Sequence, residues 1–215
     1  SESVIQWDYV KEELRLDPDS RRAVIHIRSA HDSLHESKDV PCTLSLQFFI
    51  RGGALHLHVS MRSSDIILGL AYDVPAFTIM QETMANELGV ELGEYVHTSN
   101  SLHCYERDFE MLNEIANSEG PYGFKPMRKL AGSFPTEAMV KMEEAVSSAS
   151  ASQILSGLVL ATPPFTKDFS QSDLDLVYDW SRVLLSRRLR KLKEDESAEF
   201  ALSQVNDPCY KFFER

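Results

Sequence analysis

The pattern of apolar and polar residues changes its period along the chain and predicts both helical and extended segments. Apolar residues at helical spacing predict a helix over 5–16, and the Asp17-Pro18 pair ends it. Residues 42–50 and 54–61 flank a Gly52-Gly53 pair, and apolar residues alternate with polar ones in the second arm. This pattern is typical of a β-hairpin.

The rest of the chain adds further helices and strands to this beginning. A β-branched run at 23–27 predicts a strand, and the polar stretch that follows it predicts a loop. Residues 66–89 carry the apolar positions of a long, mostly buried helix. Further elements are expected as a strand and connection over 93–108 and as helices over 110–118, 135–148 and 173–192, the last with Asp173 as its cap.

The composition is that of a globular protein. The chain has 215 residues, of which 43% are hydrophobic, enough for a sizeable core. Its three cysteines are an odd number and do not suggest a disulfide framework. No segment approaches the roughly 20 apolar residues of a membrane helix, and the first residues lack an apolar signal core. We therefore expect a cytoplasmic protein with no membrane partner and no metal site.

The charge balance bears on the class of partner. The 22 Lys and Arg residues are outnumbered by 33 Asp and Glu residues, so the formal net charge is −11. This excess argues against nucleic acid as a partner, although a small anionic ligand needs only a few well-placed arginines. Residues 182–193 are strongly basic, which favours a solvated helix end; an acidic partner or nucleic acid is the alternative.

Four separated motifs carry the candidate chemistry. They are DPDSRR at 17–22, Pro41-Cys42, RSSDIILGLAYD at 62–73 and LHCY at 102–105. Each alone has an ordinary structural explanation, such as a turn, a buried cysteine or a hydrogen-bonded His-Tyr pair. Their common order and spacing make the combination specific.

Together, these motifs resemble those of the thymidylate synthase and deoxycytidylate hydroxymethylase family, over residues from about 5 to about 128. The resemblance implies an α+β fold with a curved mixed sheet flanked by helices, and a homodimer in which two sheets pack back to back. It also implies a core over 1–150 that lacks the family's usual N-terminal segment. Residues 151–215 would form a divergent helical extension packed on that core.

The resemblance assigns covalent chemistry to Cys42 and nucleotide binding to several polar residues. A thiolate that adds to C6 of a pyrimidine makes C5 nucleophilic toward a one-carbon electrophile. The nucleotide ligands would be Arg21, Arg22, Arg62 and Ser63 at the phosphate and His103 and Tyr105 at the sugar. In the relatives the two DPxSRR arginines reach across the dimer interface.

The same resemblance implies 5,10-methylenetetrahydrofolate as the cofactor. Asp65 matches the carboxylate that binds the pterin, and Gly69 allows close approach of the chain. Gln47 also matches a family position, but we interpret it as an ordinary strand residue.

Asp73 is the second residue we assign to catalysis, and it bears on the choice of base. It stands where uracil-specific synthases have asparagine and cytosine-nucleotide hydroxymethylases have aspartate. A carboxylate accepts a hydrogen bond from the N4 amine of cytosine but faces the O4 acceptor of uracil. This favours CMP or dCMP hydroxymethylation as the activity.

Several departures from the family pattern keep two alternatives open. Thr43 replaces a histidine, Arg28-Ser29 replaces Trp-Asn, and Met61 replaces a glutamine. The family's N-terminal segment, with a phosphate-binding arginine and a catalytic glutamate, is not recognisable in this chain. One alternative is therefore a weak or inactive homologue that binds a nucleotide or serves in an assembly. The other is methylation of dUMP.

Overall fold

The computed structural model describes residues 5–34, 39–118, 129–130, 132, 136–155 and 171–206. The chain forms two compact units, residues 1–121 and 122–215. The boundary falls earlier than the one expected at 150, because α4 (Thr136–Ser148) packs on α6 (Gln171–Lys191) within the second unit. Packing of the helical extension on the core stays a prediction.

A four-stranded mixed sheet organises the first unit. Its strands, in spatial order, are β1 (Val24–His26), β2 (Thr43–Arg51), β3 (Ala54–Met61) and β5 (Glu91–Ser99). The pairs β1–β2 and β2–β3 are antiparallel, and β5 runs parallel to β3. The predicted strand and hairpin are confirmed. Gly52 and Gly53 form the hairpin turn with φ of +60° and +80°, which glycine adopts without steric cost.

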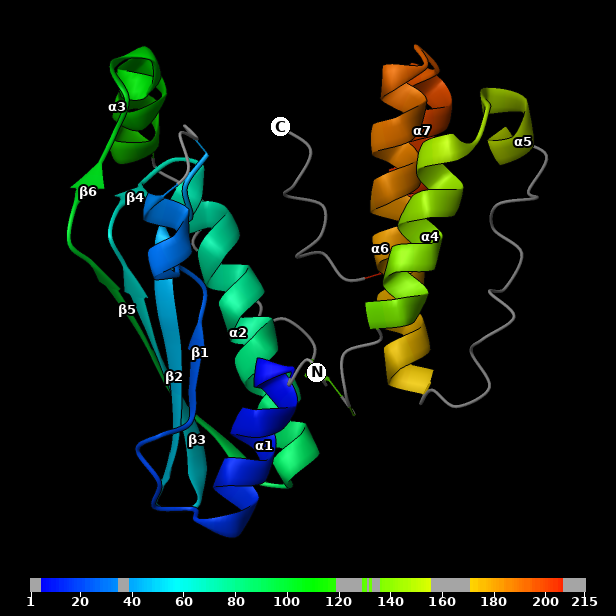
Figure 1. Ribbon diagram of the computed structural model, residues 1–215. Helices are drawn as coiled ribbons and strands as arrows, with labels where there is room; N and C mark the ends of the chain where they lie inside the picture. The colour runs from blue at the N-terminus through cyan, green and yellow to red at the C-terminus, as the bar shows by residue number, and fades with distance from the viewer. Residues whose placement is uncertain are drawn as a thin grey trace. The chain divides into compact units, whose positions relative to one another are not determined.

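Two helices cover one face of this sheet. Helices α1 (Gln6–Leu16) and α2 (Gly69–Leu88) lie on the same side of it in Figure 1. Among the described contacts of this unit, α1 packs on β1 and β2, and α2 packs on β3 and β5. Both helices were predicted, and Gly89 ends α2 in the left-handed conformation, with φ of +69°.

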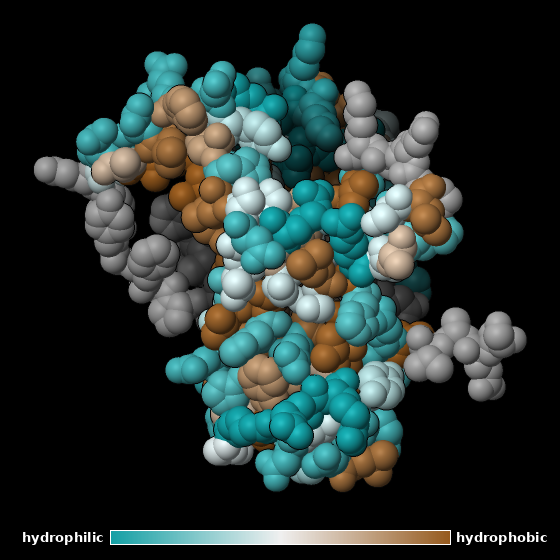
Figure 2. Space-filling model, turned by 60° about the vertical axis from the view of Figure 1, so that its left-hand side comes forward, coloured by the Kyte–Doolittle hydropathy of each residue, from teal (hydrophilic) through white to brown (hydrophobic). Residues whose placement is uncertain are grey.

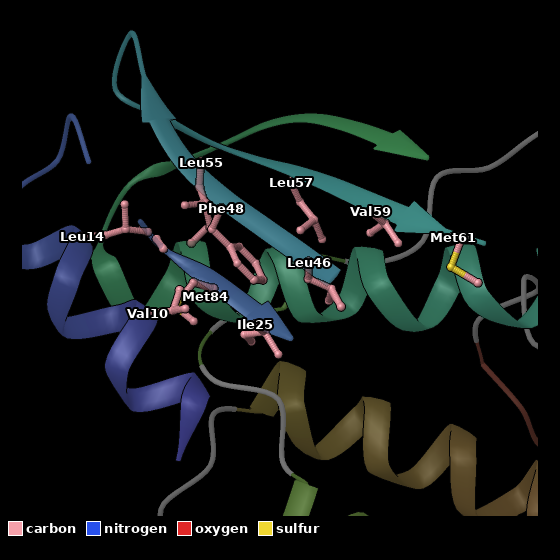
Figure 3. Packing of buried hydrophobic residues seen from close by; sticks show 12 residues of the cluster. Val10, Leu14, Ile25, Leu46, Phe48, Leu55, Leu57, Val59, Met61 and Met84 are labelled. Carbon is pink, nitrogen blue, oxygen red and sulfur yellow. The ribbon is translucent and has the colours of Figure 1, made fainter. Parts of the chain in front are cut away.

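The core lies between these helices and the sheet. Alternate residues of β2 and β3 point toward the helices, because successive side chains of a strand face opposite sides. Figure 3 shows them meeting apolar side chains of α1 and α2. The core residues labelled there are Val10, Leu14, Ile25, Leu46, Phe48, Leu55, Leu57, Val59, Met61 and Met84, all at most 6% exposed.

Short elements follow the ends of the strands. Strands β4 (Ser64–Asp65) and β6 (Leu102–His103) pair in parallel, with Asp65 opposite His103. Two 3-10 turns, η1 (Ala30–Ser33) and η2 (Glu106–Asp108), and helix α3 (Phe109–Asn117) complete the described part of this unit. The β4–β6 pairing therefore joins two motifs that lie about forty residues apart in sequence.

The second unit is helical where it is described. It contains α4, α5 (Ala151–Leu155), α6 and α7 (Asp195–Ser203). The predicted C-terminal helix is confirmed, but it begins at Gln171, so Asp173 lies within it and not at its cap. The short helices α5 and α7 were not predicted. Buried residues of α4, α6 and α7 form one cluster that includes Met142, Val146, Leu185, Leu189 and Ala198.

Part of the basic stretch is bound within this unit. The Arg188 guanidinium donates to the Ala149 carbonyl at 3.2 and 3.3 Å, and Arg190 pairs with Glu199 at 2.8 Å. These contacts favour a structural role for both arginines. Figure 2 shows hydrophilic and hydrophobic residues interspersed over the face in view. In the part of the chain that the structure describes, no helix is long and apolar enough to cross a membrane.

Candidate functional site

Cys42 lies at one end of the sheet, where Arg62 holds the chain around it. Cys42 is exposed and directly precedes β2, and Arg62 directly follows β3. The Arg62 backbone N–H donates to the Cys42 carbonyl at 2.9 Å. Its guanidinium donates to the carbonyls of Pro41 at 3.0 Å and Val40 at 2.8 Å. The arginine therefore fixes the segment that presents the thiol.

Ser63, His103 and Tyr105 lie beside this segment. The Ser63 hydroxyl is 3.3 Å from His103 Nδ1, which is also 3.4 Å from the Ser101 carbonyl. The His103 and Tyr105 rings meet edge to face with centroids 5.1 Å apart. The Arg107 guanidinium lies 4.7 Å from the centre of the Tyr105 ring. The structure thus joins the RSSD and LHCY motifs into one polar cluster.

Asp65 occupies the beginning of α2. Its carboxylate accepts backbone hydrogen bonds from Leu68 at 2.8 Å, Gly69 at 3.3 Å and Ile67 at 3.4 Å. These bonds, chiefly the one from Leu68, lower the pKa of Asp65, and the nearby charge of His103 acts in the same direction. The carboxylate is therefore ionised at neutral pH and stabilises the N-terminus of the helix.

Gly69 leaves space between two carboxylates. A Cβ atom at this position would lie 3.5 Å from Asp65 Cβ, 3.7 Å from Ser64 Oγ and 3.9 Å from Asp73 Oδ2. A larger side chain would fill this space. Ser64 is only 3% exposed, and its hydroxyl has no hydrogen-bond partner among the described residues.

Asp73 lies one turn further along α2 and is half-buried. No described residue donates a hydrogen bond to its carboxylate. Burial raises the pKa of Asp73, while the nearby His97 lowers it by a smaller amount. An unpartnered, partly desolvated carboxylate is suited to bind a ligand that brings its own donors.

Three polar residues of β5 near this carboxylate were not singled out by the sequence analysis. Tyr95, His97 and Ser99 pair with Leu57, Val59 and Met61 of β3, so they share the face that α2 covers. The Tyr95 hydroxyl is 2.8 Å from His97 Nδ1. The sequence does indicate these residues: they are polar residues at alternate positions of one strand, and the residues that face the same side on the neighbouring strand are apolar.

Arg21 and Arg22 lie toward the opposite end of the sheet. They precede β1, and β1 runs antiparallel to β2, so the chain before Val24 leads away from Cys42. The Phe48 backbone N–H donates to the Ala23 carbonyl, which places Ala23 beside Phe48. Thr43, which directly follows Cys42, lies about 17 Å from Phe48 along β2. Within one chain, the two arginines are therefore not joined to the Cys42 cluster. Gln47 is a bonded strand residue as interpreted, because its amide donates to the Arg21 carbonyl at 3.1 Å.

The second described cysteine does not share the setting of Cys42. Burial raises the pKa of the Cys104 thiol, and the charges of Asp108 and Asp65 raise it further. A thiol is nucleophilic as the thiolate, so these surroundings make Cys104 a poor nucleophile. Cys42 is the better candidate of the two.

Comparisons with known proteins find relatives of the N-terminal part of the chain. The family model described as thymidylate synthase matches residues 1–131. Thymidylate synthase 1 of Bacillus spizizenii is 34% identical over 111 residues, which are 52% of this chain and 39% of that protein. Thymidylate synthase of Bacillus atrophaeus is also 34% identical over 111 residues, which are 52% of this chain and 48% of that protein.

A solved structure extends the likeness to the fold. Thermostable thymidylate synthase A from Bacillus subtilis superposes with a TM-score of 0.50 at 32% sequence identity, covering 54% of this chain and 42% of that one. The chain thus spans less than half the length of these relatives. Residues 1–131, which the family model matches, contain the mixed sheet and the cluster around Cys42.

Proposed function

Because the chain belongs to the thymidylate synthase family, we propose that it takes part in transfer of a one-carbon unit to C5 of a pyrimidine nucleoside 5′-monophosphate. The observation that carries this proposal is the convergence of Cys42, Arg62 and His103 at one end of the sheet. The names of the relatives favour dUMP methylation as the reaction.

Cys42 is the nucleophile in this proposal. Its thiolate forms a C–S bond at C6, and the electron pair of the C5–C6 double bond moves toward C5. C5 would then bond to the one-carbon unit and lose its proton to a base as the bond between that unit and the folate nitrogen breaks. The exocyclic methylene left on the pyrimidine would take up a hydride from the folate in methylation, or water in hydroxymethylation. Elimination breaks the C–S bond, restores the C5–C6 double bond and returns the thiolate.

The nucleotide would lie along the polar cluster. Arg62 and Ser63 bind the 5′-phosphate, and His103 and Tyr105 bind the sugar hydroxyl. The Arg62 guanidinium is fixed by neutral carbonyls, so its positive charge is retained for an anion. Arg21 and Arg22 complete the phosphate site from the partner subunit of a back-to-back homodimer, which accounts for their distance from Cys42 in one chain.

The surroundings of Asp65 suit the pterin of 5,10-methylenetetrahydrofolate. The carboxylate is ionised, and an ionised carboxylate accepts hydrogen bonds from the pterin N–H groups. Gly69 lies beside it, where a Cβ would already contact Asp65, Ser64 and Asp73, so the absence of a side chain favours close approach of the ligand. The folate supplies the one-carbon unit when bound, and Asp65 and Gly69 position it.

A second candidate reaction, CMP or dCMP hydroxymethylation, is favoured by Asp73. Its carboxylate accepts from the N4 amine of cytosine, and when protonated it also donates to N3. Burial raises its pKa and so favours the shared proton. Against uracil, the ionised carboxylate faces the O4 acceptor, and an unpaired buried group costs about 1–3 kcal/mol.

An exchange experiment tests the proposal and separates its two reactions. The protein is incubated with dUMP, dCMP or CMP carrying tritium at C5, with and without methylenetetrahydrofolate. Release from dUMP indicates methylation, and release from a cytosine nucleotide indicates hydroxymethylation; product chromatography identifies the group added. Cys42→Ala should abolish release, while Cys104→Ser, the matched control, should retain it.

Nucleotide binding without tritium release would contradict the catalytic proposal. That outcome would favour the weak or inactive homologue. Calorimetry with the same three nucleotides detects it, because binding to Arg62 and His103 does not require the Cys42 thiolate.

A further inference from the structure

The carboxylate of Asp73 faces the sheet at the level of His97. Asp73 shares one stripe of α2 with Phe77, Met80, Gln81 and Met84, the side that packs on the core. The Gln81 amide fixes this stripe over β5, donating to the carbonyls of Gly93 at 3.2 Å and Glu94 at 3.1 Å.

The rise per residue of the helix and the strand gives the residue of β5 that lies opposite Asp73, near the start of α2. Asp73 precedes Gln81 by two turns, or about 12 Å along the helix axis. The strand runs in the opposite direction, because β5 follows α2 after the turn at Gly89. Four residues of a strand span about 13 Å, so the residue that lies about this far along β5 from Gly93 is His97.

His97 is held by Tyr95 and has one free ring nitrogen. The Tyr95 hydroxyl is 2.8 Å from His97 Nδ1, while the buried Nε2 has no hydrogen-bond partner among the described residues. Burial, together with the charge of Asp73, raises the pKa of Tyr95 to about 12, so the phenol keeps its proton and can donate it to Nδ1. When Nδ1 accepts from Tyr95, the N–H of Nε2 is left to donate to a nearby carboxylate.

We propose that His97 is a positioning residue for base recognition, which presents its Nε2–H toward Asp73 and fixes the orientation and protonation of the carboxylate that meets the pyrimidine. The identity of the ligand rests on the proposed function, whereas the Tyr95–His97–Asp73 arrangement does not. Ser64 and Ser99 line the same region with buried hydroxyls that have no partner among the described residues.

Among the described residues, few other charged groups face Asp73. From β5 these groups are Tyr95 and His97, and from β4 the nearest is Asp65, on the other side of Gly69. The facing residues of β3 are Leu57, Val59 and Met61. Helix α1 contacts the far end of α2, where Lys11 and Arg15 bind Glu87, about 21 Å along the axis from Asp73.

Carbon-13 NMR of the carboxyl groups in the ligand-free protein tests the arrangement. The Asp73 signal is assigned by its loss in Asp73→Asn, and its titration midpoint is compared among variants. His97→Phe should shift the midpoint upward, because a group that stabilises the carboxylate is lost. His97→Gln keeps an N–H donor and should return the midpoint toward the wild-type value. His58→Phe, on the opposite face of the sheet, is the matched control and should leave it unchanged.

The role in base recognition has a separate measurement. Calorimetry gives the affinities for dCMP and dUMP across pH. The ratio of these two affinities should change by about tenfold in His97→Phe and by less in His97→Gln. Thermal unfolding confirms that each variant is folded.

The possible failures are distinguishable. If the wild type binds none of the nucleotides, the proposed function is wrong, whatever the Asp73 titration shows. An Asp73 midpoint that is the same in wild type and in folded His97→Phe overturns the arrangement. A shifted midpoint with an unchanged dCMP to dUMP ratio overturns the role in base recognition.

Discussion

The two ends of the sheet differ in how their charged residues are paired. At the Cys42 end, Arg62 bonds to neutral carbonyls, Asp65 bonds to backbone N–H groups, and Asp73 has no donor among the described residues. At the other end, Arg22 lies 2.7 Å from Glu13 and 3.7 Å from Asp17, and Arg51 lies 4.0 Å from Asp19. Arg62, Asp65 and Asp73 therefore form no ion pair with a described residue at the end where an ionic ligand is expected.

This difference also separates Arg21 from Arg22. Arg22 is already paired within its own chain, and a phosphate would compete with Glu13 for its guanidinium. Arg21 is exposed, and it bonds to the described part of the sheet through its carbonyl, which accepts from the Gln47 amide. We therefore expect Arg21 to contribute more than Arg22 to a phosphate site in a partner subunit.

The largest expected effect concerns a site in a dimer that takes Cys42 from one subunit and Arg21, at the other end of the sheet, from its partner. Cys42→Ala and Arg21→Ala should each lower tritium release by at least about 10³-fold if both act in one site. A mixed dimer has one site with both residues intact. After subunit exchange at equal amounts, about a quarter of wild-type activity should return, because half of the dimers are mixed and each has one competent site.

A control fixes the meaning of that recovery. If each site takes both Arg62 and Cys42 from the same chain, every site in a mixed dimer of Cys42→Ala and Arg62→Ala lacks one of the two residues. This mixture should therefore show no more activity than the separate proteins. Recovery in this second mixture as well would show that Arg62 also comes from the partner subunit, or that wild-type protein contaminates the mixture. No recovery in the first mixture would contradict donation of Arg21 across the interface.

A smaller effect is expected from shortening the reach of the Arg62 guanidinium. Arg62→Lys keeps the charge but cannot donate to the Val40 and Pro41 carbonyls while forming a fork to phosphate. Nucleotide affinity should fall about 10- to 100-fold. Arg51→Lys, at the other end of the sheet, is the matched control. Calorimetry measures both, and equal affinities for the two variants would remove Arg62 from the phosphate site.

The sequence predicted the elements better than the connections between them. Alternation in 54–61 and the glycine pair predicted the hairpin because strand period and turn chemistry are local properties. The same hairpin places Arg62 beside Cys42, while the roles that the motifs assign to these two residues stay predictions. The Tyr95–His97 bond was missed because it depends on which face of β5 meets α2, and this is decided by tertiary packing.

The next effect concerns stability and tests whether Asp65 holds the start of α2. Asp65→Ala removes the acceptor of three backbone N–H groups and should lower the free energy of unfolding by about 1 kcal/mol at neutral pH. Denaturant unfolding measures this loss. Asp108→Ala, a change at another helix start whose side chain forms no cap, is the control. A loss no larger than the control's would show that the cap contributes little.

The smallest effect compares the two carboxylates of α2, whose pKa values move in opposite directions. Burial raises the pKa of Asp73 above its ordinary value of 3.8, so folding favours the protonated form and stability is lost as pH rises through the folded-state pKa. Asp73→Asn should therefore be more stable than wild type at pH 7, with the difference vanishing below pH 3.8. The pKa of Asp65 is lowered below 3.8, so its charge stabilises the folded protein at higher pH. This stability is lost as pH falls through the folded-state pKa. Asp65→Asn should thus be less stable than wild type at pH 7. Melting temperatures measured across pH test both signs, and a shared sign would contradict the different pairing of the two groups.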